Sequence, residues 1–384
     1  TAGLTFKWLK NNVLIANQTK DSLLVDSAYN YRAIVSNTGC SDTSNVKYLT
    51  VHPLPKAGFT INNASQCLNS NNFIFTDTSK ITTGSTSRLW TVNGIDTSTN
   101  ITTNKSFANV GTYTIKLLAI SNYGCKDSIT KTVSVNPIPK AGFTINNASQ
   151  CVNGNNFSFN DTSNIASGTL TRKWNLGTGN NDTSLLASTN KSYSLANNYF
   201  IKLIVTSNYG CKDSISKSVV VHPKPAVNYI ISNPTQCLKG NSFSFTDTSS
   251  ITYGTIERKW NFGTGNLDTS TNANPVKNYT TPNTYTVKLV ATSNNNCKDS
   301  ISKPITVNPQ PSAIIITIGN TDFCANKNVI LKANQAASQT YSWLKNDSLI
   351  PQNNDSILLV STGGTYQLVI KNIFNCIDTS TKTT

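Results

Sequence analysis

The sequence predicts an all-β protein, built as a linear tandem array of antiparallel β-sandwiches. The peptide PKAGFTINNASQC occurs at residues 55–67 and again at 139–151, and diverged copies start at Pro225 and Pro311, so the repeats start 84, 86 and 86 residues apart. This spacing is longer than the ~20–50 residues of solenoid repeats and fits a small self-contained domain. Each repeat alternates apolar and polar residues in short runs, which Asn, Gly and Ser turns divide. No helical period competes with this pattern.

The repeat divides the 384 residues into five modules. They are a partial module that aligns with the back half of a repeat (1–53), three complete modules (54–137, 138–223 and 224–309), and a module that lacks the end of its last strand (310–384). We call them the N-terminal module, the first, second and third central modules, and the C-terminal module. Both ends of the chain fall inside a module and the sequence contains no Met, so we expect a segment of a longer polypeptide.

The second central module shows the expected elements in order. Strands are predicted at 141–146, 157–161, 171–175, 198–208 and 212–223, with a polar turn region at 147–155. Phe157 and Phe159 fall on one face of their strand, because side chains alternate between the two faces. Pro-x-Pro linkers separate the modules and restrict rotation between them. These linkers lie at 53–55, 137–139, 223–225 and 309–311.

Each module has one Trp that is predicted to fill its core. In the three central modules this Trp lies 23 residues after the first Cys, on an alternating strand. A sandwich of this size needs one large aromatic side chain at its centre. The alternative, a stacking platform for sugars, would need an exposed ring. The predicted core residues are Trp8, Trp90, Trp174, Trp260 and Trp343.

Motifs around these Trp residues resemble the polycystic-kidney-disease (PKD) domain family. Trp260-Asn-Phe-Gly-Thr-Gly resembles the family signature W-D-F-G-D-G, although Asn261 and Thr264 replace its two Asp residues. NPVKNYTTPNTYTVKL at 274–289 is similar to the family's N-P-x-H-x-Y-x-x-P-G-x-Y-x-V-x-L. The resemblance covers 55–309. It implies PKD-like sandwiches in the three central modules.

The two flanking modules look like immunoglobulin-like (Ig-like) modules instead. FKWLKNNVLI surrounds Trp8, and YSWLKNDSLI surrounds Trp343. PKD-like and Ig-like modules are both familiar in very large secreted surface proteins of Bacteroidota, including gliding-type adhesins. By this analogy the resemblance implies adhesion or display.

A repeated Arg and a repeated Asp are predicted to form a structural ion pair. In each central module the Arg precedes the Trp by two residues, and the Asp follows a Phe-x-Phe strand on its core face. The flanking modules lack both, with Phe6 and Tyr341 at the Arg position. We expect a charge-assisted, partly buried pair that closes one end of the core and specifies structure rather than chemistry. The predicted pairs are Arg88 with Asp77, Arg172 with Asp161, and Arg258 with Asp247.

The nine Cys residues occupy two regular positions. An early Cys precedes the Trp of its module, and a late Cys lies in the turn before the last strand. This regular pattern predicts disulfides and an oxidising compartment. Pairing within modules would join Cys67–Cys125, Cys151–Cys211, Cys237–Cys297 and Cys324–Cys376. Pairing between modules would join Cys67–Cys211, Cys151–Cys297 and Cys237–Cys376, and would leave Cys40, Cys125 and Cys324 free or bonded elsewhere. The second scheme is favoured, because the early and late Cys of one sandwich lie at opposite poles ~20 Å apart, whereas bonded Cys need Cα atoms within ~7 Å. Both schemes remain open at this point.

The sequence offers no assembled reaction chemistry. It has no C-x-x-C, and its two His residues, His52 and His222, occupy a linker position that holds Asn in other repeats. We therefore predict no enzyme activity, no catalytic residue, no metal site and no cofactor. Repeated Asp-Ser pairs resemble a short O-glycosylation signal of Bacteroidota, although they also fit plain strands. The candidate serines are Ser22, Ser27, Ser128, Ser214, Ser300, Ser348 and Ser356.

The net charge of +15 has two interpretations. It can attract anionic polysaccharide or cell surfaces, or it can reflect Lys residues spread along solvated faces. Nucleic acid is not an expected partner, since no recognised nucleic-acid-binding motif accompanies the charge.

The predicted function is that of a non-catalytic structural or adhesive segment of a giant extracellular or cell-surface protein. Such a segment would act as a stiff spacer that displays or forms adhesive filaments. Its partners would be other modules of the same chain and like chains in a fibre. The alternative is a carbohydrate-binding accessory array of a secreted polysaccharide-degrading enzyme.

Overall fold

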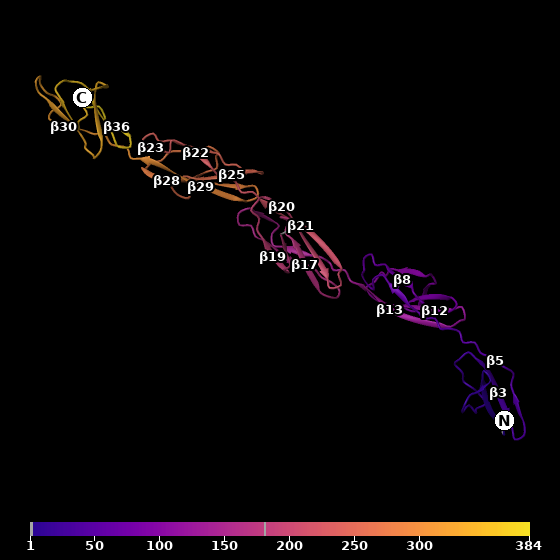
Figure 1. The fold of residues 1–384 in the computed structure, drawn as a ribbon. Helices are drawn as coiled ribbons and strands as arrows, with labels where there is room; N and C mark the ends of the chain where they lie inside the picture. Colours follow the sequence, from indigo (N-terminus) through magenta and orange to yellow (C-terminus); the bar gives the residue numbers. More distant parts are fainter. Residues whose placement is uncertain (1–2, 180–181) are drawn as a thin grey trace.

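The computed structural model describes residues 3–179 and 182–384. Within these ranges every regular element is a β-strand, there is no helix, and the strands form nine sheets. The modules follow one another along an elongated, gently bent line with the two termini at opposite ends (Figure 1). The predicted all-β tandem architecture is therefore confirmed.

The first central module is a sandwich of a three-stranded and a five-stranded sheet. Its strands are β6 (Phe59–Ile61), β7 (Ser65–Cys67), β8 (Phe73–Asp77), β9 (Thr86–Val92), β10 (Ile95–Ser98), β11 (Thr102–Lys105), β12 (Gly111–Ser121) and β13 (Lys126–Asn136). The sheet orders are β11-β8-β6 and β10-β9-β12-β13-β7.

The second and third central modules repeat this arrangement. The second contains β14 (Phe143–Ile145), β15 (Ser149–Cys151), β16 (Phe157–Asp161), β17 (Leu170–Asn175), β18 (Thr183–Ser184), β19 (Ser188–Lys191), β20 (Asn197–Ser207) and β21 (Lys212–His222). The third contains β22 (Tyr229–Ser232), β23 (Thr235–Cys237), β24 (Phe243–Asp247), β25 (Ile256–Asn261), β26 (Thr269–Ser270), β27 (Val276–Lys277), β28 (Asn283–Ser293) and β29 (Lys298–Asn308). Their sheets are β14-β16-β19 with β15-β21-β20-β17-β18, and β22-β24-β27 with β23-β29-β28-β25-β26.

The two terminal modules differ from the central ones. The N-terminal module forms a single sheet from β1 (Thr5–Lys10), β2 (Val13–Leu14), β3 (Asn30–Ser36), β4 (Ser41–Thr43) and β5 (Lys47–Tyr48). The C-terminal module has two sheets, made of β30 (Ile315–Ile318), β31 (Val329–Ala333) and β34 (Ile357–Val360), and of β32 (Thr340–Lys345), β33 (Ser348–Leu349), β35 (Tyr366–Lys371) and β36 (Ile377–Thr379).

Each complete core is built around its Trp. Trp90, Trp174, Trp260 and Trp343 are almost fully buried. In the second central module the ring of Phe143 meets that of Trp174 edge-on, with centroids 5.1 Å apart. The prediction for Trp8 is wrong, because this side chain is only half-buried. The described part of the N-terminal module has one sheet, so no facing sheet covers the ring.

The polar turn region predicted at 147–155 is also only partly correct. Ser149–Cys151 forms β15, which pairs in parallel with the end of β21, with Cys151 level with His222. β7 and β23 pair with β13 and β29 in the same way, so each central sandwich contains one parallel strand pair. These strands are three residues long and polar, too short to carry an alternating pattern, so only their place beside the last strand defines them.

Candidate functional site

The most elaborate polar and covalent features lie where one module meets the next. The parallel pairing places the early Cys beside the last residue of its module's final strand, Cys67 beside Asn136 for example. The early Cys therefore lies at the exit of its module, which is the end where the chain leaves for the next linker. The opposite end, where the chain arrives from the preceding linker, is the entrance. The late Cys lies at the entrance of its module, in the turn before the final strand, as Cys211 does between β20 and β21. Each of the last three junctions thus brings an early and a late Cys from different modules together.

Three disulfides span these junctions. Cys67 is bonded to Cys211, Cys151 to Cys297 and Cys237 to Cys376, with Cα atoms 5.6, 5.5 and 5.5 Å apart. The sequence left two pairing schemes open, and the structure contains the one that joins neighbouring modules. Pairing within a module is not found, because its two Cys lie at opposite ends of the sandwich. Cys40, Cys125 and Cys324 are free.

The two linkers on either side of the second central module are packed against the modules they join. Pro137, Pro139, Pro223 and Pro225 are all buried, so these Pro-x-Pro segments are part of the structure rather than loose hinges. A buried linker with a fixed proline φ angle leaves few conformations for the neighbouring modules.

The last junction uses polar contacts as well. Pro309 is exposed there, but its carbonyl oxygen accepts a hydrogen bond from Nδ2 of Asn372 at 2.8 Å. Lys239 of the third central module reaches across to the Asp378 carboxylate of the C-terminal module at 3.3 Å. Contacts from both sides of the junction therefore supplement the disulfide.

The first junction lacks a disulfide and uses an aromatic contact. His52, in the linker, stacks on Tyr123 of the turn between β12 and β13, with ring centroids 3.9 Å apart and planes 9° apart. Cys125, two residues beyond Tyr123, is free. His52 therefore packs the linker against the first central module.

Its counterpart His222 forms a serine–histidine contact. Ser149 Oγ lies 2.7 Å from His222 Nε2, while His222 Nδ1 is buried without a hydrogen-bond partner. A catalytic triad would place a carboxylate at Nδ1. In the preceding module Asn136 Nδ2 donates a hydrogen bond to Ser65 Oγ at 2.8 Å, in the same position. The contact between Ser149 and His222 therefore occupies the position of a structural hydrogen bond, which joins the short parallel strand to the last strand of the module.

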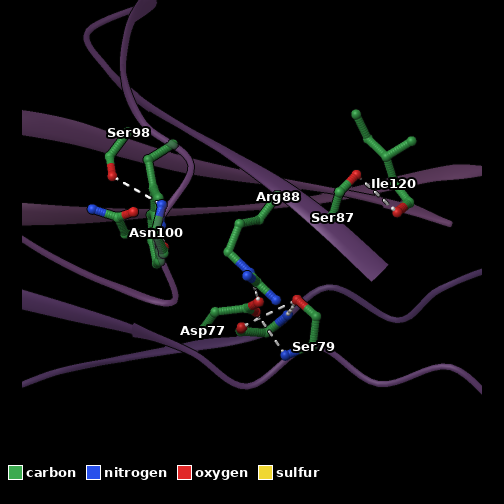
Figure 2. A network of polar contacts seen from close by, with 9 residues as sticks. Asp77, Ser79, Ser87, Arg88, Ser98, Asn100 and Ile120 are labelled. Carbon is green, nitrogen blue, oxygen red and sulfur yellow. Dashed lines mark hydrogen bonds and ion pairs between the residues drawn. The ribbon is translucent and has the colours of Figure 1, made fainter. Parts of the chain in front are cut away.

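The three predicted Arg–Asp pairs are all present. Arg88 Nε donates to Asp77 Oδ2 at 2.6 Å, and the Ser79 backbone N–H donates to the other carboxylate oxygen at 2.8 Å, as Figure 2 shows. Arg172 pairs with Asp161 and Arg258 with Asp247 in the same way. The Asp side chains are nearly buried, whereas the Arg side chains are 19–31% exposed. Each pair lies beside the first strand of its module, since Asp161 is level with Phe143 of β14.

The pKa of each paired Asp reflects two opposing effects. Burial of the Asp161 carboxyl raises its pKa, but hydrogen bonds from Ser163 and Arg172 outweigh burial and hold the pKa below its usual value. The same balance lowers the pKa of Asp77 and of Asp247. These carboxylates therefore stay ionised inside the sandwich, where they hold the guanidinium and the following turn in place.

A second set of contacts joins the first and last strands of the first and second central modules, and sequence reasoning missed it. Asp213 Oδ2 accepts a hydrogen bond from the Ala141 N–H at 2.8 Å. Lys217 Nζ donates to the Phe143 carbonyl at 2.5 Å and lies 5.0 Å from the centre of its ring. Asp127 and Lys131 make the equivalent contacts in the first central module. The recurrence of Asp and Lys four residues apart on the final strand of every central module was the available signal.

The candidate glycosylation serines differ in their exposure. Ser22, Ser128, Ser214, Ser300 and Ser348 are exposed, whereas Ser27 and Ser356 are half-buried. The two half-buried hydroxyls also make hydrogen bonds, to Asp26 and with Gln335 respectively. Glycosylation of these residues stays a prediction.

Residues 3–179 and 182–384 offer neither a metal site nor a membrane-spanning helix. Nowhere in these ranges do three or more His, Cys, Asp or Glu side chains gather closely enough to hold a metal ion. These ranges also contain no helix that is long and apolar enough to cross a membrane.

Comparisons with known proteins agree with the module type. Residues 222–309 match the family model of the PKD domain. The first and second central modules have the same sheet orders as this matched segment, so the three form one tandem set. No curated protein matches the chain in sequence.

Several solved structures are similar to parts of the chain. The PKD1 domain of the Vibrio cholerae metalloprotease PrtV is 30% identical, and the match covers 22% of this chain and 98% of that domain, with a TM-score of 0.20. The PKD1 domain of Vibrio anguillarum Epp is 24% identical over 22% of this chain and 95% of that domain, with a TM-score of 0.20. An I-band fragment of titin is 12% identical over 68% of this chain and 100% of the fragment, with a TM-score of 0.38.

Proposed function

We propose that this chain is a non-catalytic spacer segment of a larger extracellular protein, whose stiffness positions an adhesive or displayed element away from a surface. The observation that carries the proposal is the disulfide across each of the last three junctions. A disulfide placed beside a short Pro-x-Pro linker gives two covalent connections at one junction, which opposes both bending and rotation. Disulfides of this kind are stable in oxidising compartments, which supports an extracellular location.

The spacer proposal is tested by the resting shape of the full chain in solution. We expect small-angle X-ray scattering of the oxidised chain to give a rod with one maximum dimension. Mild reduction should broaden the distance distribution, because each junction then keeps only its peptide linker. Substitution of Ser for all six bonded Cys should reproduce the reduced profile without a reductant. An oxidised chain as flexible as this variant would contradict the proposal.

A second candidate, a carbohydrate-binding accessory array, is favoured by one repeated surface feature. Lys202 of β20 lies level with Asn175 of β17 and Ser216 of β21 on the open face of the larger sheet. In the second central module this face has a shallow pocket beside Lys173, Thr183 and Lys202. Lys116 and Lys288 occupy the same position in the other central modules and are also exposed. Ammonium, amide and hydroxyl groups in one patch suit a carboxylated or sulfated polysaccharide.

The test of this candidate compares two triple variants of the full chain with equal net charge. One replaces Lys116, Lys202 and Lys288 by Gln, and the control replaces the exposed Lys7, Lys20 and Lys47 of the N-terminal module. Binding to a sulfated polysaccharide, measured by affinity electrophoresis, should weaken much more in the first variant. An equal effect in both variants would show that the polysaccharide is bound only by a general attraction between opposite charges.

A further inference from the structure

The positions of the disulfides divide the array into two continuous covalent routes. The first route follows β6 and β7 to Cys67 and crosses through the disulfide to Cys211. It then follows β21, the linker, β22 and β23 to Cys237, where a second disulfide leads to Cys376. The second follows β13 through the linker to β14 and β15, crosses from Cys151 to Cys297, and follows β29 into the C-terminal module. Each central module therefore carries both routes, one in its early strands and one in its last strand.

The two routes run side by side and in the same direction. At the exit of each module the early strand pairs in parallel with the last strand, with Cys151 level with His222 and the Val152 N–H donating to the His222 carbonyl at 2.8 Å. At the entrance they are joined by the hydrogen bond from the Ala141 N–H to Asp213 and by the Lys217 contact with Phe143. Side-chain and backbone bonds thus hold both routes together at each end of the module.

Most of each central module and of the C-terminal module lies outside the first route. The Cys67–Cys211 bond closes a sequence separation of 144, and the Cys237–Cys376 bond closes one of 139. The strands inside these loops, β8 to β12 for example, cannot be drawn out by pulling on the chain ends while the disulfides are intact. Because the 11-residue β21 is already extended, little slack remains where the route passes through the second central module.

From this connectivity we propose that the array is a tension-bearing tether, in which load passes along the first and last strands of the central modules and by-passes the strands between them. The proposal deepens the spacer function and rests on it. A spacer needs only stiffness at rest, whereas a tether also has to keep its length when its ends are pulled apart. No change in the covalent bonds is required, since the disulfides already present set the limit.

Single-molecule force spectroscopy of the full chain, held at its two termini, tests the tether. In the native chain the shortest covalent route uses only residues 1–67, 211–237 and 376–384. Reduction should therefore increase the fully stretched length by about 1,000 Å, at ~3.4 Å per residue. A native chain that extends as far as the reduced chain would overturn the proposal.

Paired substitutions sharpen the test. Cys67→Ser with Cys211→Ser should lengthen the stretched chain by roughly 400 Å, because the shortest route must then follow the backbone to Cys151, cross to Cys297, return to Cys237 and cross to Cys376. Cys151→Ser with Cys297→Ser is the matched control, since it removes one disulfide of the same type but leaves the shortest route unchanged. Equal lengthening in both variants would contradict the assigned route.

The outcome can be separated from that of the spacer proposal. A chain that is flexible at rest in scattering but limited in extension would contradict the spacer and support the tether. A rod at rest that extends fully without reductant would contradict the tether alone.

Discussion

At the scale of single residues, the Arg–Asp pair is the main polar feature inside each central sandwich. Asp161 is only 2% exposed, so its charge depends on partners for stabilisation, whereas Arg172 is 29% exposed and keeps contact with water. Loss of the guanidinium would leave a nearly buried carboxylate with the Ser163 donors alone. Removal of one partner of such a pair is costly, while its joint replacement by apolar residues is often tolerated.

We predict that Arg172→Met destabilises the second central module by about 3 kcal/mol. Hydrogen exchange of the amides in β16 and β17 measures this local effect within the full chain. Lys173→Met is the matched control, because Lys173 is the next residue on β17 and lies exposed on the opposite face. The double change of Arg172 and Asp161 to apolar residues should recover much of the loss. If Arg172→Met matches the Lys173 control, the pair does not stabilise this module.

The same pairs predict a dependence on acid. The pKa values of Asp77, Asp161 and Asp247 are lowered in the folded chain, so their stabilising contribution is present above the unfolded-state pKa of about 3.9. It is lost as the pH falls through the lower folded-state pKa. Denaturant midpoints of the central modules should therefore decrease below about pH 4. The decrease should be smaller in the second module of Arg172→Met, and an identical acid response would show that other carboxylates are responsible.

At the scale of elements, the last strand of each module does more than complete its sheet. β14 is paired through its backbone only with β16, in the smaller sheet. Asp213 and Lys217 of β21 contact its start from the larger sheet and so connect the two layers at the module entrance. The Asp-Ser-Ile motif, whose serine is a glycosylation candidate, contains this structural Asp.

Asp213→Ala should therefore loosen β14 without disturbing β21. We expect faster exchange of the β14 amides, equivalent to about 1–2 kcal/mol, since a charged acceptor of a backbone N–H is removed. Ser216→Ala, on the exposed face of the same strand, should leave β14 unchanged. Unaltered β14 exchange in Asp213→Ala would mean that the backbone pairing with β16 is sufficient.

At the scale of the whole molecule, interleaved disulfides make the array tolerant of a broken backbone. Cys151 lies within the loop that Cys67 and Cys211 close, and Cys211 lies within the loop that Cys151 and Cys297 close. A single cut anywhere from residue 68 to 375 therefore leaves the two termini covalently connected.

A protease site inserted after Thr83, in the exposed turn between β8 and β9, tests this tolerance. The cleaved native chain should migrate as one species without reductant and as two fragments with it. The Cys67→Ser and Cys211→Ser variant should separate into two fragments in both conditions, whereas the Cys151→Ser and Cys297→Ser variant should stay joined. Release of fragments from the unreduced native chain would contradict the inter-module pairing.

The sequence alone determined the features that depend on local pattern. Alternation over five or more residues predicted β16, β17, β20 and β21 closely, because a strand with one buried face needs a period of two. One Trp per repeat predicted the centre of each complete core, and the joint occurrence of Arg and Asp predicted their pairing.

Only the tertiary structure decided the features that depend on neighbours distant in sequence. β15 is too short to show a pattern and exists because β21 offers an unpaired edge. Trp8 follows the same local motif as Trp343, yet one sheet cannot bury it. The choice between the two disulfide sets belongs here too. Cys151 and Cys211 share a module but lie at its opposite ends, whereas Cys297 of the next module lies within bonding distance of Cys151.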